Sequence, residues 1–166
     1  MPGASAGEIQ PDRTEITGID AGPLDLFATL ARTALFLEAV QRECLGEHSL
    51  SFAEYSVLRL LQRAPGGHLA PSWLAEQLVY TTGAMTKLVD RLQRAGLVER
   101  APDPRDRRGV LVEVTRAGDR KATEAADTYE AGRQRILDQL GDRNTERIHS
   151  SLRQLLAVLE ADRSQR

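Results

Sequence analysis

The chain has 166 residues, of which 41% are hydrophobic and 28% are charged. This length suits one domain with a substantial core and is too short for two large domains. No segment approaches the roughly 18 consecutive apolar residues of a membrane span, and the N-terminus lacks a signal-peptide pattern. The single cysteine, Cys44, allows neither an internal disulfide nor a cysteine metal cage. We therefore expect a cytoplasmic protein with no metal, cofactor or membrane contact.

The formal net charge of -2 hides a segregation of charge along the chain. Residues 81–121 contain ten Lys and Arg against six Asp and Glu, so this segment carries +4 and the remainder carries -6. A chain that is acidic overall and basic in one segment usually meets a polyanion there. Charged helix surfaces can produce the same pattern, so charge alone leaves nucleic-acid binding open.

The N-terminal part of the chain changes character at Pro23. Residues 1–22 are rich in Gly, Ala, Pro and acids without a sustained period, which predicts a flexible arm. From Pro23 to about Leu45, apolar residues recur at spacings of three and four, which predicts a helix that is apolar on more than one face.

Three further helices are expected before the basic segment ends. The first, FAEYSVLRLLQR, follows a capping box in which Ser51 and Glu54 satisfy backbone N–H groups. The second, SWLAEQL, begins at Pro71, because proline loses no hydrogen bond in a first helical turn. The third, GAMTKLVDRLQRA, is capped by Thr81 or Thr82. The residues expected to face inward are Tyr55, Leu58 and Leu61 in the first of these helices and Met85, Leu88, Val89 and Leu92 in the third.

After Gly96 the period of apolar residues drops from about 3.6 to about 2. LVERA and GVLVEV alternate as strands do, and the segment between them is expected to form a hairpin. Thr115 can cap a long helix over residues 116–140, which Gly141 ends. A last helix carries an apolar stripe made of Ile148, Leu152, Leu155, Leu156 and Leu159. The expected fold class is mainly α with a small β-hairpin.

The helix that begins at Pro71 and the helix GAMTKLVDRLQRA are expected to form a helix-turn-helix. The hairpin after them is expected to form a wing. The start of GAMTKLVDRLQRA has small residues that allow this helix to enter a major groove. It also has short polar or basic residues that can reach bases or phosphates. Its N-terminus also offers unsatisfied N–H groups to a phosphate. The predicted DNA contacts of the two helices are Pro71, Ser72, Thr81, Thr82, Gly83, Ala84, Thr86, Lys87 and Arg91.

The wing carries Arg105, Arg107 and Arg108 at its tip, where arginine can enter an adjacent minor groove. Arginine suits a narrow groove because its charge is planar and weakly hydrated. We expect Asp106 to hold Arg108 in a fixed rotamer. A metal site or acid/base pair formed by Asp103 and Asp106 is disfavoured, because a wing tip is convex and wet whereas such chemistry needs a shielded cleft.

The stretch TTGAMTKLVDRLQRAGLVERAPDPRDRRGVLVEVTRAG resembles the helix-turn-helix and wing of the MarR family of bacterial transcription regulators. The matching motifs are the Gly-Leu-Val-Glu-Arg entry to the wing, Asp106-x-Arg108, and Thr115-x-x-Gly118. The helix order matches over residues 24–160. The resemblance implies a homodimer built by the first and last helices, a pseudo-palindromic site on double-stranded DNA, and a small-molecule effector that often lowers DNA affinity. It also implies that Arg108 enters the minor groove with Asp106 as its partner.

The expected organisation has three parts. Residues 1–22 form the arm, residues 23–50 and 116–162 form a helical dimerisation region, and residues 51–115 form the winged helix-turn-helix DNA-binding domain. The expected function is that of a transcriptional regulator without enzymatic activity, acting as a repressor that a small ligand releases.

Family analogy also places a ligand pocket at Tyr55 and Arg59, one turn apart on the helix after the capping box, between the dimerisation helices and the DNA-binding domain. The urate-responsive branch of the family has a ligand-binding aspartate and arginine where this chain has Ser56 and Leu88, which argues against urate. Cys44 lies among apolar residues and is typical of a small core residue. A redox-responsive regulator that senses through Cys44 remains an alternative, as does a helical interaction module that has lost DNA binding.

Other residue types point to no further chemistry. Trp73 and Tyr80 are expected to be core and packing residues rather than stacking platforms for single strands. His48, His68 and His149 lack metal-ligand spacing. No nucleophile or acid/base cluster is visible in the sequence, which disfavours an enzyme.

Overall fold

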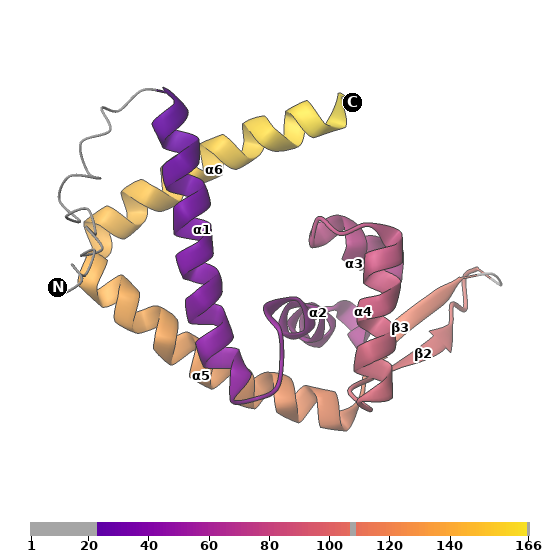
Figure 1. The fold of residues 1–166 in the computed structure, drawn as a ribbon. Helices are drawn as coiled ribbons and strands as arrows, with labels where there is room; N and C mark the ends of the chain where they lie inside the picture. The colour runs from indigo at the N-terminus through magenta and orange to yellow at the C-terminus, as the bar shows by residue number, and fades with distance from the viewer. Residues whose placement is uncertain (1–22, 107–108, 166) are drawn as a thin grey trace, which may run out of the picture. The chain divides into compact units, whose positions relative to one another are not determined.

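The computed structural model describes residues 23–106 and 109–165 (Figure 1). The described residues divide into two compact units, one that ends at Glu38 and one that begins at Ala39. Helix α1 (Pro23–Gly46) begins in the first unit and ends in the second. The predicted arm, residues 1–22, lies outside the described residues.

The second unit contains the remaining helices in the predicted order. They are α2 (Phe52–Arg63), α3 (Pro71–Gln77), α4 (Thr82–Arg94), α5 (Arg116–Leu140) and α6 (Asp142–Ser164). Two predicted caps are confirmed. The Ser51 hydroxyl accepts a hydrogen bond from the Glu54 backbone N–H at 3.3 Å, and the Thr81 hydroxyl accepts one from the Ala84 N–H at 3.2 Å. Of the two candidate threonines, Thr81 therefore caps α4.

The sheet is antiparallel and has the strand order β1-β3-β2. It consists of β1 (His68–Leu69), β2 (Val98–Pro102) and β3 (Val110–Val114). The predicted hairpin is confirmed, with Val112 opposite Arg100 of β2. Strand β1 was not predicted. Its two residues are too few to show an alternating pattern, and it forms only because β3 comes to lie beside it.

One hydrophobic core lies in the second unit. Its fully buried large side chains are Leu45, Val57, Leu58, Leu61, Leu74, Met85, Leu88, Val89, Leu92, Val98 and Val112. All four predicted inward residues of α4 are among them, and each such burial contributes about 1.5–3 kcal/mol. The core therefore holds one face of α4 and leaves the opposite face to solvent. The mainly helical fold class with a small sheet is confirmed.

The start of α5 is joined to the end of α4 through Thr115. Its hydroxyl donates to the Gly96 carbonyl at 2.8 Å and accepts from the Gly118 N–H at 3.0 Å, while its own N–H donates to the Leu97 carbonyl at 3.1 Å. A Cβ at position 118 would lie 2.0 Å from the Leu97 carbonyl oxygen. The Thr-x-x-Gly motif is thus a joint between the wing and α5 that only glycine allows.

The prediction that Cys44 is a core residue is confirmed, whereas the same prediction for Trp73 and Tyr80 is not. Cys44 is buried in the second unit, against Gly132 of α5, where a Cβ would come within 2.5 Å of its sulfur. Trp73 and Tyr80, in contrast, are each 40% exposed, so the prediction that they pack inward was wrong. Helix α3 is short and turns only Leu74 and Ala75 into the core, which leaves Trp73 partly exposed, and Tyr80 lies in the turn that follows α3.

Candidate nucleic-acid interface

The turn between α3 and α4 sets how α4 leaves the core. The Tyr80 N–H donates to the Ala75 carbonyl at 2.8 Å, and the Val79 N–H donates to the Glu76 carbonyl at 3.2 Å. Val79 adopts a left-handed conformation with φ of 58°. This tight turn places Thr81 at the cap of α4 and brings α3 and α4 into contact as a helix-turn-helix.

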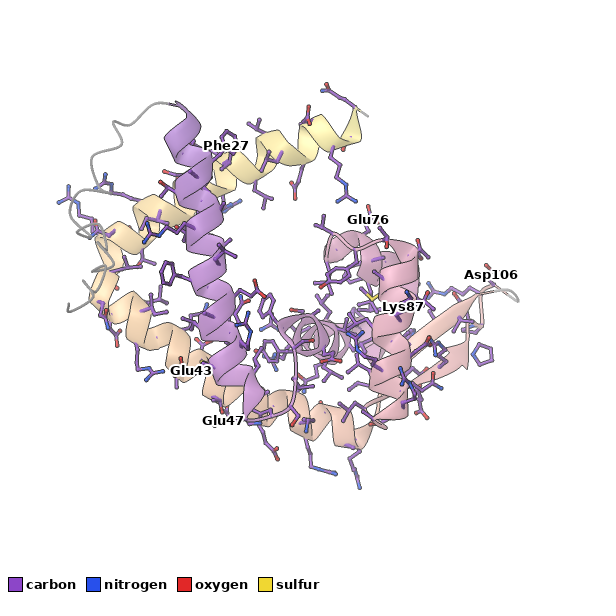
Figure 2. All side chains as sticks on the ribbon, in the orientation of Figure 1. Phe27, Glu43, Glu47, Glu76, Lys87 and Asp106 are labelled. Carbon is purple, nitrogen blue, oxygen red and sulfur yellow. The ribbon has the colours of Figure 1, made fainter. Side chains whose placement is uncertain are left out.

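The outer face of α4 carries most of the predicted contact residues. Thr81, Thr82, Gly83, Thr86 and Lys87 are exposed, and Ala84 is half-buried. Figure 2 shows Lys87 on α4 and Asp106 at the outer end of the hairpin. On α3, Ser72 is exposed and Pro71 is half-buried. Small and polar side chains therefore cover the face of α4 that the core leaves free.

Two neighbouring residues of α4 form ion pairs with different elements. Arg91 Nε donates to Glu54 Oε1 of α2 at 3.1 Å, and Arg100 Nη2 of β2 donates to Asp90 Oδ1 at 2.6 Å. Arg100 also donates to Gln93. Arg91, predicted as a DNA contact, is thus held by α2 as well as exposed. Sequence reasoning missed both pairs, because each joins residues from separate elements.

The pKa of Glu54 lies below its usual value. Burial acts to raise this pKa, but hydrogen bonds from the Ser51 backbone and hydroxyl and the contact with Arg91 together outweigh burial. Glu54 is therefore a carboxylate at neutral pH.

Asp103 shapes the wing tip. Its Oδ1 accepts from the Arg105 N–H at 2.8 Å, and its own N–H donates to the Gly109 carbonyl at 3.0 Å. The Gly109 N–H donates to the Asp106 carbonyl at 2.8 Å, and a Cβ on Gly109 would lie 2.8 Å from the Asp103 Cβ. Asp103 thus has a structural role in closing the loop, and Gly109 allows the loop to close.

Of the three predicted wing arginines, only Arg105 is among the described residues. Arg105 is exposed near the tip. Arg107 and Arg108 lie outside the described residues, and so does the predicted contact between Asp106 and Arg108.

A cavity of about 740 Å³ lies beside α2 and α5. Both predicted pocket residues, Tyr55 and Arg59, line it. The full lining is Phe52, Tyr55, Ser56, Arg59, Leu60, Arg63, Gln77, Leu78, Ala126, Asp127, Tyr129, Glu130 and Arg133. The rings of Phe52, Tyr55 and Tyr129 form an aromatic cluster with centroids 5.4 to 6.3 Å apart. Burial raises the pKa of Tyr55, which stays a neutral phenol. The residues that α5 contributes to this cavity were not predicted individually, since no sequence pattern pairs a residue of α2 with one of α5.

Residues 23–106 and 109–165 contain no group of three or more His, Cys, Asp or Glu able to hold a metal ion. Within the same residues, no helix is long and apolar enough to cross a membrane.

A short helix, a tight turn, a second helix with an exposed polar face and an adjoining hairpin define a winged helix-turn-helix protein. The sequence pattern of the MarR family matches residues 48–109. The chain is 29% identical over 111 residues to the transcriptional regulator PecS of Dickeya dadantii, covering 66% of this chain and 67% of PecS. It is 33% identical over 100 residues to the transcriptional repressor YetL of Bacillus subtilis, covering 60% of each.

Among solved structures, the transcriptional regulator BldR from Sulfolobus solfataricus superposes with a TM-score of 0.69 at 29% identity, covering 81% of this chain and 94% of BldR. The chain belongs to the MarR family. The relatives it matches are transcriptional regulators rather than enzymes. The alignments span about two thirds of PecS and three fifths of YetL.

Proposed function

We propose that the protein is a DNA-binding transcriptional regulator that represses by binding a pseudo-palindromic operator as a homodimer. The observation that carries this proposal is the division of α4 into two faces. One face is buried in the core, and the other presents small, polar and basic side chains next to the wing hairpin. A helix held in this way has the chemistry needed to enter a major groove. The repressor role is supported by the name of YetL.

Specific contacts are proposed for both parts of the interface. Thr82, Gly83, Thr86 and Lys87 would face the major groove, with Ala84 at its edge and Thr81 at the helix start. The wing arginines would enter the minor groove, with Asp106 orienting Arg108. Further contacts are proposed for Pro71, Ser72 and Arg91.

Dimerisation is proposed for residues 23–50 and 116–162, with residues 51–115 as the DNA-binding domain. Helix α1 exposes Leu26, Phe27, Leu35, Phe36 and Leu37, and helix α6 exposes Ile148, Leu152, Leu156, Val158 and Leu159. Apolar stripes of this extent mark protein interfaces. A two-fold dimer would bury them and set two recognition helices about 34 Å apart.

The effector is proposed to bind in the cavity beside α2 and α5. Its lining has three arginines, Arg59, Arg63 and Arg133, against Asp127 and Glu130, so the lining carries a net positive charge. Arg133 is paired with Glu130. Together with the aromatic cluster, this chemistry favours a small aromatic anion. We further propose that the protein works in the cytoplasm, where it meets its DNA.

The DNA proposal is tested by removing one cation from each part of the interface. We expect Arg108→Ala to weaken specific binding by about 1–3 kcal/mol, and Lys87→Ala to reduce the salt slope by about one unit. Fluorescence anisotropy at several salt concentrations, with DNA from upstream of the protein's own gene, measures both. The control is Arg120→Ala, which removes an exposed cation from α5. Binding by both variants equal to that of the control would contradict the proposed interface.

A further inference from the structure

One carboxylate joins the first turn of α2 to the recognition helix α4. Glu54 Oε2 accepts from the Ser51 N–H at 2.9 Å and from the Ser51 hydroxyl at 2.7 Å. Its other oxygen, Oε1, accepts from Arg91 Nε at 3.1 Å. Each oxygen of Glu54 thus serves a different helix.

The ion pair between Glu54 and Arg91 requires less loss of side-chain freedom than an ordinary surface ion pair. Exposed ion pairs contribute little because two long side chains must give up their rotamer freedom. The Glu54 side chain is only 17% exposed and is already fixed by the capping box, while that of Arg91 is 52% exposed. Only Arg91 has to be ordered, so the pair defines a position for α4 relative to α2.

The ion pair between Glu54 and Arg91 restrains rotation of α4 about its axis, which the apolar core restrains only weakly. Apolar contacts of Met85, Leu88 and Val89 hold α4 on the domain, but they are non-directional. A charge-assisted hydrogen bond is directional. Arg91 reaches α2 while its neighbour Asp90 reaches the wing strand β2, so the two pairs together resist rotation of α4 about its axis.

We infer that Glu54 is a positioning residue for DNA recognition, which holds α4 through Arg91 in the rotation that presents its outer face to an operator. This inference rests on the proposed DNA-binding function. Positioning and charge have opposite consequences for Glu54→Gln. Loss of a negative charge would strengthen binding to any DNA, whereas loss of positioning weakens binding to the operator alone.

The experiment compares binding of the full chain to two duplexes of equal length, one from upstream of its own gene and one with that sequence scrambled. We expect Glu54→Gln to bind the operator roughly fivefold more weakly than a variant that loses only a carboxylate charge, a typical coupling between packed elements, and to bind scrambled DNA as that variant does. Glu76→Gln, at an exposed carboxylate on α3, controls for charge. Ser51→Ala weakens the α2 cap and loosens Glu54 but keeps the carboxylate that binds Arg91, so it should lower the ratio of operator to scrambled affinity less than Glu54→Gln does. Circular dichroism checks that every variant is folded.

The role of Arg91 is tested by a double-mutant cycle. In an Arg91→Met background, Glu54→Gln should no longer change the ratio of operator to scrambled affinity. Arg91→Lys should restore much of the ratio that Arg91→Met loses. An undiminished effect of Glu54→Gln without Arg91, or an operator affinity equal to that of Glu76→Gln, overturns the inference while leaving DNA binding intact. Equal binding of both duplexes by the unmodified protein overturns the inference and the proposed function together.

Discussion

Val79 holds the turn between α3 and α4 in a conformation that valine resists. Its φ of 58° lies in the left-handed region, where a β-branched side chain is rare. Left-handed backbone costs an L-residue about 1–2 kcal/mol, and the side chain is 70% exposed, so little burial offsets this. The residue therefore stores strain beside the proposed DNA interface.

Replacing Val79 should release this strain. We expect Val79→Gly to raise the free energy of unfolding by about 0.5–1 kcal/mol, because relief of the left-handed strain exceeds the added freedom of the unfolded chain. Urea unfolding monitored by circular dichroism measures the change. Val79→Ala keeps the Cβ and serves as the control. A glycine variant less stable than the alanine variant would show that the valine side chain contributes contacts outweighing its strain.

At the scale of elements, the first turn of α2 serves two sites. Phe52, Tyr55 and Ser56 line the cavity, and Glu54 from the same turn contacts α4. A ligand that shifts this turn would move Glu54, and Glu54 contacts Arg91 of the recognition helix α4 directly. The proposed effector site and the proposed DNA site therefore share one structural element.

The chemistry of the cavity can be tested with simple probes. Benzoate at ten times its Kd should stabilise the protein by roughly 1.4 kcal/mol, which corresponds to about 3–6 °C in melting temperature. Benzamide has the same ring without the charge and should produce a smaller shift. Arg63→Ala should reduce the benzoate shift, whereas Arg120→Ala, outside the cavity, should not. Equal shifts with benzoate and benzamide would contradict an anion site.

Over the whole molecule, the exposed leucines on α6 and the exposed aromatic residues on α1 are surfaces of the kind that mark protein interfaces. We expect size-exclusion chromatography with light scattering to give twice the 18.3 kDa chain mass. Leu156→Glu places a charge in the α6 stripe and should favour the monomer. Gln154→Glu adds the same charge at an exposed polar position and should leave the dimer intact. A monomeric unmodified protein at micromolar concentration would refute this prediction.

Features that depend only on neighbouring residues could be predicted from the sequence. The caps at Ser51 and Thr81, the buried face of α4 and the β2–β3 hairpin were all predicted, because caps, helical period and strand alternation act within a few residues. The MarR resemblance was likewise visible in a continuous stretch that includes Thr115 and Gly118.

The contacts between residues far apart in the sequence could not be predicted in this way. Strand β1 exists because β3 lies beside it, Arg91 meets Glu54 because α2 and α4 pack together, and Tyr129 joins the cavity because α5 runs past α2. The exposure of Trp73 likewise follows from how little of α3 the core covers. The period of an element predicts which of its faces is buried, but it does not say which other element packs against that face.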